Sequence, residues 1–420
     1  MAATLAQGLS PVREELANGA VVLVQENSMT PAVTISASFH AGSVFDPPER
    51  PGLAYLTGRV LDRGTTTRSA AVLADELDDR GVSLRVSTNR QALTISCTCL
   101  SEDFDDILAI IVDVARNPVF PAAEVDKRRS EALTVLRQNE DNPASRALEG
   151  VLELLYTPDH PYGRPSKGNA VGVERVSRAD LVEFHARRLR PGTLAVSIVG
   201  DIAAEEALGR ALAALDGWRT PPPEPAVLLP PPPIDRRQRL IAMPGKLQTD
   251  IAYGFTAVPR LDPRYYAYWM MNNILGQFGL GGRLADNIRE RQGMAYYAFS
   301  TLDPAPLDAP LLIRAGVDPA NVERALAAID HEVRTLAATG PTATELDESR
   351  AYLIGSIPRL LETNQSIASF LQMCEEYGLG LDFDQRLPHL LGAVTLEQVH
   401  AAAAEVLDPE RAAIAIAGPS

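Results

Sequence analysis

The sequence lacks pairs of histidines at the spacing from which many zinc sites are built. Such sites place two ligands a few residues apart, often on one face of a helix. No two of the six histidines in this chain are separated by three to five residues. The sequence therefore predicts no zinc site made from a histidine pair, and we expect the chain by itself to hold no metal or other cofactor.

Cysteine is also scarce. The three cysteines, an odd number, argue against a disulfide scaffold and fit a reducing compartment. Cys97 and Cys99 lie in the segment 93–99, whose alternation is typical of a strand with both thiols on one face. We expect them to be small buried side chains rather than metal ligands, because no partner histidine or cysteine stands nearby in the sequence.

Long apolar runs, an N-terminal leader pattern and an excess of basic charge are absent as well. No apolar run approaches the roughly 20 residues that a membrane helix needs, and residues 1–8 have neither the basic nor the apolar region of a signal peptide. The formal net charge of −15 argues against binding of nucleic acid. We predict a cytoplasmic protein with no membrane partner and no nucleic-acid partner.

Proline and internal repetition are what the sequence does have. The proline-rich segments 221–225 and 230–233 cannot form a helix or a central strand, and they divide the chain nearly in half. The two halves repeat each other at an offset of 218 residues. The repeated elements are a helix start (176–181 and 394–399, with Ser177 and Thr395 as natural N-caps) and a strand (194–200 and 412–418).

The repeat defines the expected fold. Strand pairs followed by long helices in each half predict α+β layers, and a length of 420 residues is enough for two domains. We predict an N-terminal domain over residues 1–220, a proline-rich linker over 221–237 and a C-terminal domain over 238–420.

The segment 52–65 reads GLAYLTGRVLDRGT. It resembles the zinc-site helix of the pitrilysin and insulinase metallopeptidases, whose H-x-x-E-H motif supplies two ligands and a glutamate that activates the metal-bound water. The resemblance places Tyr55 and Arg59 at the ligand positions and Gly58 at the position of the base. Arginine stays protonated and cannot ligate, tyrosine is a poor zinc ligand at neutral pH, and glycine has no side chain to act as a base.

The same resemblance implies a third ligand, a glutamate on a later helix just ahead of a D-N-P-like turn. Here the corresponding segment is 131–143, and the ligand position falls on or next to Val135, between Thr134 and Leu136. Three ligand positions and the base position are thus all changed. The resemblance therefore implies a degenerate zinc site.

A second segment, 289–296, reads RERQGMAY. It resembles the part of the same family in which an arginine and a tyrosine, seven residues apart, bind the peptide backbone near the scissile bond. Arg289 and Tyr296 match that pair, and the stretch 272–300 follows the family's order. A guanidinium can donate to carbonyl oxygens, and a phenol can donate to a developing oxyanion. Without the rest of that stretch, the segment would be an ordinary charged helix followed by a strand.

Together the two segments imply a subunit that helps to cut peptides but cannot cut them alone. The resemblance implies two similar α+β domains that face each other as a clamshell. It also implies a heterodimer, as in mitochondrial processing peptidase, in which a homologous subunit with H-x-x-E-H holds the zinc. The expected substrate is a peptide or an unstructured polypeptide.

Two other functions remain open. One is a structural or peptide-binding scaffold of the same superfamily, which would have no need of Arg289 and Tyr296. The other is a self-sufficient hydrolase, which the absence of a G-x-S-x-G motif disfavours. Whether the glycine-rich segment 276–282 guides substrate is also left open by the sequence.

Overall fold

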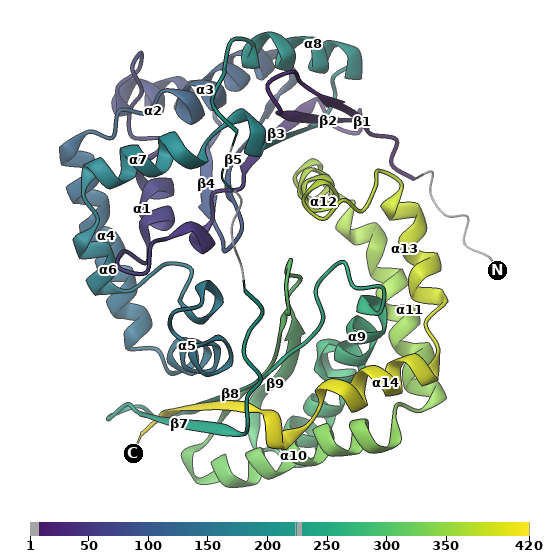
Figure 1. Ribbon diagram of the computed structural model, residues 1–420. Coiled ribbons are helices and arrows are strands. Elements are labelled where there is room, and N and C mark those ends of the chain that lie inside the picture. The colour runs from purple at the N-terminus through teal and green to yellow at the C-terminus, as the bar shows by residue number, and fades with distance from the viewer. Residues whose placement is uncertain (1–7, 223, 225–228, 420) are drawn as a thin grey trace. The chain divides into compact units, whose positions relative to one another are not determined.

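In the computed structural model, which describes residues 8–222, 224 and 229–419, the chain forms two compact units (Figure 1). Each unit is made from both halves of the sequence. The first comprises Met1–Leu136, Pro165–Val227 and Ile357–Gln385, and the second comprises Arg137–Arg164, Leu228–Ser356 and Arg386–Ser420.

The described part of the first unit is built on a six-stranded sheet in the order β1-β2-β6-β3-β5-β4. Neighbouring strands are antiparallel except β2 and β6, which are parallel. The strands are β1 (Val12–Glu15), β2 (Val21–Glu26), β3 (Ala32–Phe39), β4 (Arg85–Thr88), β5 (Leu93–Leu100) and β6 (Leu194–Gly200).

One face of this sheet is packed against helices and forms the main core of the unit. Helix α3 contributes an apolar stripe at helical spacing, Ile107, Ile111 and Val114, all of them buried. Burial of each such side chain stabilises the fold by about 1.5–3 kcal/mol. The helices of the first unit are α1 (Leu53–Val60), α2 (Ala70–Asp78), α3 (Phe104–Arg116), most of α4 (Ala122–Glu140), α6 (Ala170–Arg175), α7 (Arg178–Arg188), α8 (Ala204–Leu215) and α12 (Asn364–Glu376).

The other face of the sheet is covered in part by α12, which comes from the C-terminal half of the sequence (Figure 1). Ile367, Ala368 and Leu371 of α12 form a small second core with Leu23 and Val199 of the sheet. The strands β3, β5 and β4 carry polar side chains on this face, so the apolar contact with α12 is confined to the β2–β6 side.

The described part of the second unit is built on a five-stranded sheet in the order β7-β11-β8-β10-β9. Only β7 and β11 are parallel neighbours within it. Its strands are β7 (Arg237–Ala242), β8 (Thr249–Thr256), β9 (Ala295–Leu302), β10 (Pro310–Val317) and β11 (Ala413–Gly418). The α-helices of this unit are α5 (Pro143–Tyr156), α9 (Tyr265–Asn272), α10 (Val322–Thr339), most of α11 (Ala343–Leu360), most of α13 (Phe383–Gly392) and α14 (Leu396–Val406).

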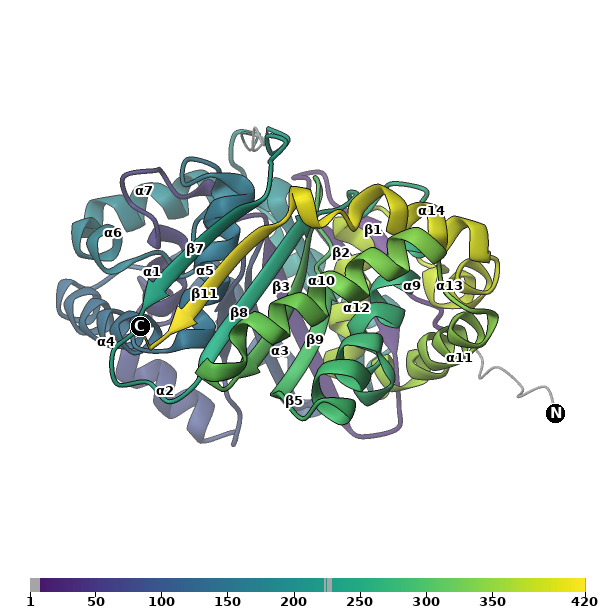
Figure 2. The same ribbon diagram turned by 90° about the horizontal axis from the view of Figure 1, so that it is seen from below.

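Helix α5, from the N-terminal half of the sequence, packs on β8 and β11 of this second sheet (Figure 2). Two glycines allow the close approach. A Cβ on Gly150 would lie 3.0 Å from Cβ of Ala415, and a Cβ on Gly254 would lie 2.8 Å from Leu155. The two halves of the sequence thus exchange a helix, α5 for α12, between the units.

The predicted α+β fold with two sheets is confirmed. The repeated strands are β6 and β11, and the repeated helices are α7 and α14, whose N-caps Ser177 and Thr395 accept hydrogen bonds from Asp180 N and Gln398 N. The division at 221–237 stays a prediction, and the repeat on which it rests does not reveal the helix exchange. Residues 1–7, and residues 223 and 225–228 of the predicted linker, lie outside the described residues. Among the described helices, none is long and apolar enough to cross a membrane.

Candidate functional site

Three of the four positions predicted for a degenerate zinc site, Tyr55, Gly58 and Arg59, lie on α1, whose start is held by a buried carboxylate. Gly52 has φ of +101°, a backbone conformation that favours glycine. Its N–H and that of Ala54 donate to the carboxylate of Asp46, at 2.6 Å and 2.8 Å. A negative charge at a helix N-terminus is stabilising. The frame residues that the sequence keeps at the beginning of this helix therefore serve to form it.

Gly58, at the position of the general base, is closed off by strand β4. A Cβ at this residue would lie 2.6 Å from Oγ1 of Thr88, and the next nearest atoms, on Val86 and Leu93, would be 3.6 Å and 3.7 Å away. The volume that a glutamate stem would need is thus occupied by a threonine side chain. At the position predicted for the base, there is thus little space for a side chain.

Arg59, at the second ligand position, forms an ion pair with the helix that carries the third position. Its guanidinium donates to Glu131 of α4 at 2.8 Å, and Arg128 donates to the same carboxylate at 2.8 Å. The guanidinium groups of Arg128 and Arg59 hold the pKa of Glu131 below its usual range. Because the side chains of Arg59 and Glu131 are more than a third exposed, the pair contributes at most about 1 kcal/mol.

The remaining two positions carry no metal-binding chemistry. Tyr55 is half-buried against the core of the first unit, and Val135 is a half-buried aliphatic residue on α4. Across residues 8–222, 224 and 229–419 there is no group of three His, Cys, Asp or Glu side chains that could hold a metal ion.

Cys97 and Cys99 are buried side chains, as predicted, and two of the histidines bond backbone carbonyls. Cys97 and Cys99 are buried in the core of the first unit, and burial raises the pKa of Cys97 to about 11 and that of Cys99 to about 12. His160 bonds the carbonyl of Leu229, and His185 bonds that of Ala115, each through Nε2 at 2.8 Å.

The substrate-binding pair predicted from the sequence lies in the second unit. Arg289 is in a π-helical turn, Ala285–Arg291, and its exposed side chain has Nε 3.4 Å from the carboxylate of Glu290. Tyr296 is the second residue of β9 and is 81% exposed. Both side chains are therefore accessible to a ligand of the second unit.

A β-bulge places Tyr296 in that position. Ala295 lies opposite Val317 of β10, and Tyr297 lies opposite Gly316, so Tyr296 is the extra residue of β9. A bulge bends its strand and changes the direction of the side chain that it carries. Here the result is an exposed tyrosine on β9, the last strand of the described sheet.

Two glycines of the segment 276–282, Gly276 and Gly282, have a packing role. A Cβ on Gly276 would lie 2.6 Å from N of Ser300 on β9, and a Cβ on Gly282 would lie 2.8 Å from Cα of Gly276. These contacts explain glycine at the two positions without a substrate. Guidance of substrate by this segment stays an open hypothesis.

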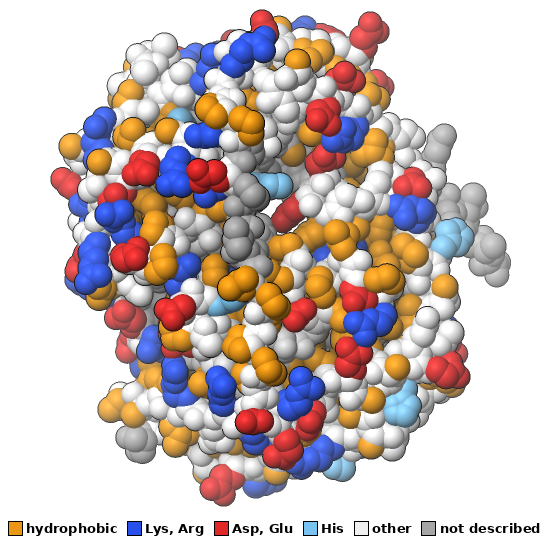
Figure 3. Space-filling model, in the orientation of Figure 1, with side chains coloured by type: hydrophobic (Ala, Val, Ile, Leu, Met, Phe, Trp, Pro, Cys, Tyr) orange, Lys and Arg blue, Asp and Glu red, His pale blue; other side chains and the backbone are white. Residues whose placement is uncertain are grey.

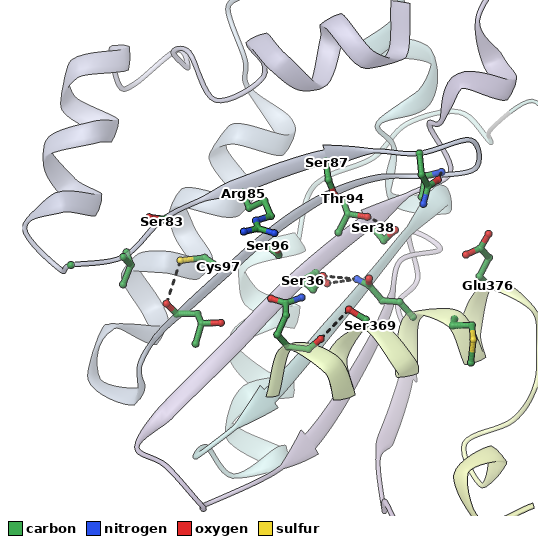
Figure 4. Close-up of a pocket in the computed structure, with 18 residues that line it drawn as sticks. Ser36, Ser38, Ser83, Arg85, Ser87, Thr94, Ser96, Cys97, Ser369 and Glu376 are labelled. Atoms are coloured by element: carbon green, nitrogen blue, oxygen red, sulfur yellow. Dashed lines mark hydrogen bonds between the residues drawn. The ribbon is translucent and has the colours of Figure 1, made fainter. Parts of the chain in front are cut away.

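A cavity of about 770 Å³ in the first unit was missed by the sequence reasoning (Figure 4). It lies between α12 and the face of the sheet opposite the main core. The side chains of its floor are Ser36 and Ser38 of β3, Thr94 and Ser96 of β5, and Arg85 and Ser87 of β4. Hydroxyl residues at every second position of β3 and β5 are the sequence signal that could have revealed a polar sheet face.

The polar groups of this cavity are held by hydrogen bonds. Gln372 of α12 donates to O and Oγ of Ser36 at 2.8 Å and 3.0 Å, and Oγ of Ser38 lies 3.1 Å from Oγ1 of Thr94. Glu376 lies on α12, apart from Arg85 on β4 (Figure 4). Partial desolvation by the surrounding protein raises the pKa of the Glu376 carboxyl, although part of this side chain is accessible to solvent. The cavity therefore offers many neutral hydrogen-bonding groups and few charges.

The described surface shows no extended area of one charge on the face in Figure 3, where basic and acidic side chains are interspersed. A nucleic-acid footprint is a continuous basic patch. This face therefore provides no such footprint.

Comparison with known proteins identifies the family. A family model described as "Insulinase (Peptidase family M16)" matches residues 21–165, and one described as "Peptidase M16 inactive domain" matches residues 175–353. The chain belongs to the M16 peptidase family. The resemblance inferred from the two segments is thereby confirmed.

The M16 relatives span nearly the whole chain. An uncharacterised zinc protease of Mycobacterium tuberculosis is 26% identical over 422 residues, which cover 99% of this chain and 94% of that protein. The non-peptidase homolog YmxG of Helicobacter pylori is 24% identical over 385 residues, covering 90% and 87%. This second relative is described as a homologue that is not a peptidase.

Solved structures agree with the M16 fold. An M16 inactive domain from Pseudomonas fluorescens has a TM-score of 0.91 at 26% identity and covers 98% of each chain. A protease from Helicobacter pylori has a TM-score of 0.90 at 15% identity, which shows the fold alone. Together with the changed ligand positions, these findings are consistent with a non-catalytic member of the M16 family.

Proposed function

We propose that this chain is the non-catalytic, substrate-binding subunit of a heterodimeric zinc peptidase. Its partner is a homologous M16 subunit that carries H-x-x-E-H and holds the zinc. Its substrate is a peptide or an unstructured polypeptide. In this assignment Arg289 and Tyr296 bind the peptide backbone, and the partner supplies the metal, the nucleophilic water and the base.

One observation carries the proposal: the chain keeps an exposed Arg289 and Tyr296 while the positions for zinc and base are changed. Tyr296 is 81% exposed on a bulged strand, so its burial contributes little to the core. An aromatic side chain held in that way is suited to contact another molecule. At α1, by contrast, Arg59 and Gly58 provide neither a ligand nor a base.

The cavity of the first unit supports a peptide as the ligand. An extended peptide presents one backbone donor and one backbone acceptor per residue. Burying these groups without hydrogen-bond partners costs free energy, so a binding site must supply partners for them. Ser36, Ser38, Thr94 and Ser96 offer hydroxyl groups that can donate or accept along such a chain. A polar floor also avoids a preference for one particular side chain, which fits binding of varied unstructured segments.

The alternative is a scaffold of the M16 family without a proteolytic role. The printed description of the Helicobacter pylori relative, a non-peptidase homolog, fits either a helper subunit or a scaffold. The exposed Arg289 and Tyr296 favour the helper, because a scaffold needs neither a guanidinium nor a phenol at these positions.

Reconstitution tests the proposal. The chain and an H-x-x-E-H homologue from the same genome are purified separately, mixed, and assayed on quenched fluorescent peptides without stable structure. We expect a heterodimer that cleaves the peptides, and no cleavage by this chain alone. Chelator-sensitive turnover by the isolated chain, or a heterodimer that is no more active than the partner alone, would contradict the proposal.

Substitutions in the pair separate a helper from a scaffold. Loss of one oxyanion donor typically costs about 100- to 1000-fold in rate, so Tyr296→Phe, which removes one hydroxyl group, should lower turnover by that order. Arg289→Ala should also lower turnover. Arg291→Ala is the matched control, because Arg291 is exposed on the same helical turn and pairs with Asp286 at 2.6 Å. An assembled complex whose turnover is unchanged by Tyr296→Phe and Arg289→Ala would favour the scaffold.

A further inference from the structure

Three residues form a row across the second sheet beside the exposed tyrosine. Asp250 of β8 lies opposite Gly316 of β10, and Gly316 lies opposite Tyr297 of β9. Residues directly opposite each other in an antiparallel ladder present their side chains on the same face. Asp250 and Tyr297 thus share a face, with only a glycine between them.

Gly316 gives the Tyr297 ring room to cross the middle strand. A Cβ on Gly316 would lie 2.7 Å from Cε1 of Tyr297 and 2.6 Å from Nε2 of Gln248. Any larger residue would displace both side chains. Because that position is glycine, the Tyr297 ring can lie over β10 and bring its phenol to β8.

The phenol ends on a buried carboxylate. Oη of Tyr297 donates to Oδ1 of Asp250, and Nε2 of Gln248 donates to Oδ2 at 3.1 Å. Asp250 is 97% buried, and a buried carboxylate needs such donors because its desolvation is costly. Burial and the hydrogen bond to Asp250 raise the pKa of Tyr297 well above its usual range. At neutral pH the phenol is protonated, as an unperturbed tyrosine also is, and it donates to Asp250.

This contact lies directly beside the bulge. Tyr297 is the first paired residue after the bulged Tyr296, so fixing the Tyr297 side chain fixes the backbone from which Tyr296 projects. The two adjacent tyrosines differ in their surroundings, since Tyr296 is exposed and Tyr297 is bonded across the sheet. Positioning of a reacting group requires support of this kind from residues behind it.

We propose that the Tyr297–Asp250 hydrogen bond, formed across Gly316, holds the β9 bulge in the conformation that presents Tyr296 to a peptide substrate. Tyr297 and Asp250 are positioning residues and do not touch the substrate. The inference rests on the proposed function, because it assigns to Tyr296 the role of a substrate contact.

A double-mutant cycle on the reconstituted complex tests the inference. Tyr297→Phe removes only the hydroxyl group, and a misplacement of about 1 Å can cost up to about 100-fold in rate. We expect Tyr297→Phe to lower kcat in the otherwise unchanged chain, with KM little affected. In the Tyr296→Phe background the same substitution should cause no further loss, since the hydroxyl group to be positioned is absent. An equal loss in both backgrounds would mean a general structural role and would overturn the inference.

The outcomes also distinguish this inference from the proposed function. If Tyr296→Phe and Arg289→Ala both leave turnover unchanged, the proposed function fails. If Arg289→Ala lowers turnover and Tyr296→Phe does not, the inference fails, because Tyr296 then supplies no group that needs positioning. If Tyr296→Phe lowers turnover and Tyr297→Phe does not, only the positioning role fails. Should Tyr297→Phe not fold, Asp250→Ala is the second variant, because it removes the acceptor of the phenol. It should lower kcat in the otherwise unchanged chain and cause no further loss in the Tyr296→Phe background, and an equal loss in both backgrounds would overturn the inference.

Hydrogen exchange on the full isolated chain gives a readout that needs no partner. With the cross-sheet contact removed by Tyr297→Phe, the amides of residues 295–297 should exchange faster. The amides of β11, which is separated from β9 in the sheet order, should be unaffected. Unchanged exchange at 295–297 would show that the bulge is held by other contacts and would overturn the inference.

Discussion

The contact between Gly58 and Thr88 predicts a reversal in the effect of one substitution. Replacing a glycine inside a helix by alanine normally stabilises a protein by about 0.5–1 kcal/mol. At Gly58 the added Cβ would lie 2.6 Å from Oγ1 of Thr88, while the next nearest side chains, Val86 and Leu93, would be 3.6 Å and 3.7 Å away. Overpacking of this kind costs about 1–3 kcal/mol. Gly58→Ala should therefore destabilise the chain by up to about 2 kcal/mol.

Removal of the threonine hydroxyl should restore the normal effect. Thr88→Ala clears the one close atom, so Gly58→Ala in that background should stabilise the chain by about 0.5–1 kcal/mol. The coupling between the two substitutions is then about 1–3 kcal/mol, within the range found for residues in contact. Gly58→Glu should destabilise the unchanged chain more than Gly58→Ala does, and Thr88→Ala should reduce that destabilisation as well.

Urea denaturation followed by tryptophan fluorescence measures this coupling. The chain has two tryptophans, of which Trp218 is buried in the first unit. A Trp269→Phe background makes Trp218 the reporter of the unit that contains α1. A coupling below about 0.3 kcal/mol, the limit for independent sites, would refute the idea that β4 closes the position of the base.

Three further predictions follow from the same geometry. The purified chain should carry no stoichiometric zinc, and metal analysis that finds one tightly held zinc per chain would contradict the degenerate site. Glu131→Gln should lower stability by less than about 1 kcal/mol. Because Arg128 and Arg59 hold the pKa of Glu131 below its usual range, that difference should be present above about pH 4.3, disappear as the pH falls through the folded-state pKa, and be measurable by denaturation at pH 7 and pH 3. The thiols of Cys97 and Cys99, with pKa values raised to about 11 and about 12, should resist alkylation at pH 8 until urea unfolds the chain.

Elements that depend on local pattern could be predicted from the sequence. The strands β6 and β11 are short apolar runs, and α7 and α14 begin at Ser177 and Thr395, whose side chains accept from the third residue of each helix. The sequence also predicts the changed ligand positions, because Tyr55 and Arg59 lie in a segment whose frame otherwise resembles that of the family, and these positions stay a prediction. In each case the signal lies within a few consecutive residues.

Features that depend on contacts between distant segments could not be predicted. The exchange of α5 and α12 depends on which sheet each helix packs on, and the apolar stripe of a helix does not specify its partner in the sequence. The bulge at Tyr296 is defined by the register with β10, and the register is not visible in β9 alone. The closure at Gly58 likewise needs Thr88, which is thirty residues away in the sequence.

Gly52 on α1 and Tyr296 on β9 both match the family's pattern, but the fold explains only the first of them. On α1, Gly52 is kept because its φ of +101° starts the helix and its N–H donates to buried Asp46. Folding alone accounts for that frame, so its survival says nothing about catalysis. Folding does not account for Tyr296, which is 81% exposed and contributes little to any core. The exposure of Tyr296, on a bulge beside a buried hydrogen bond between Tyr297 and Asp250, is therefore the observation on which we base the proposal that it contacts a peptide.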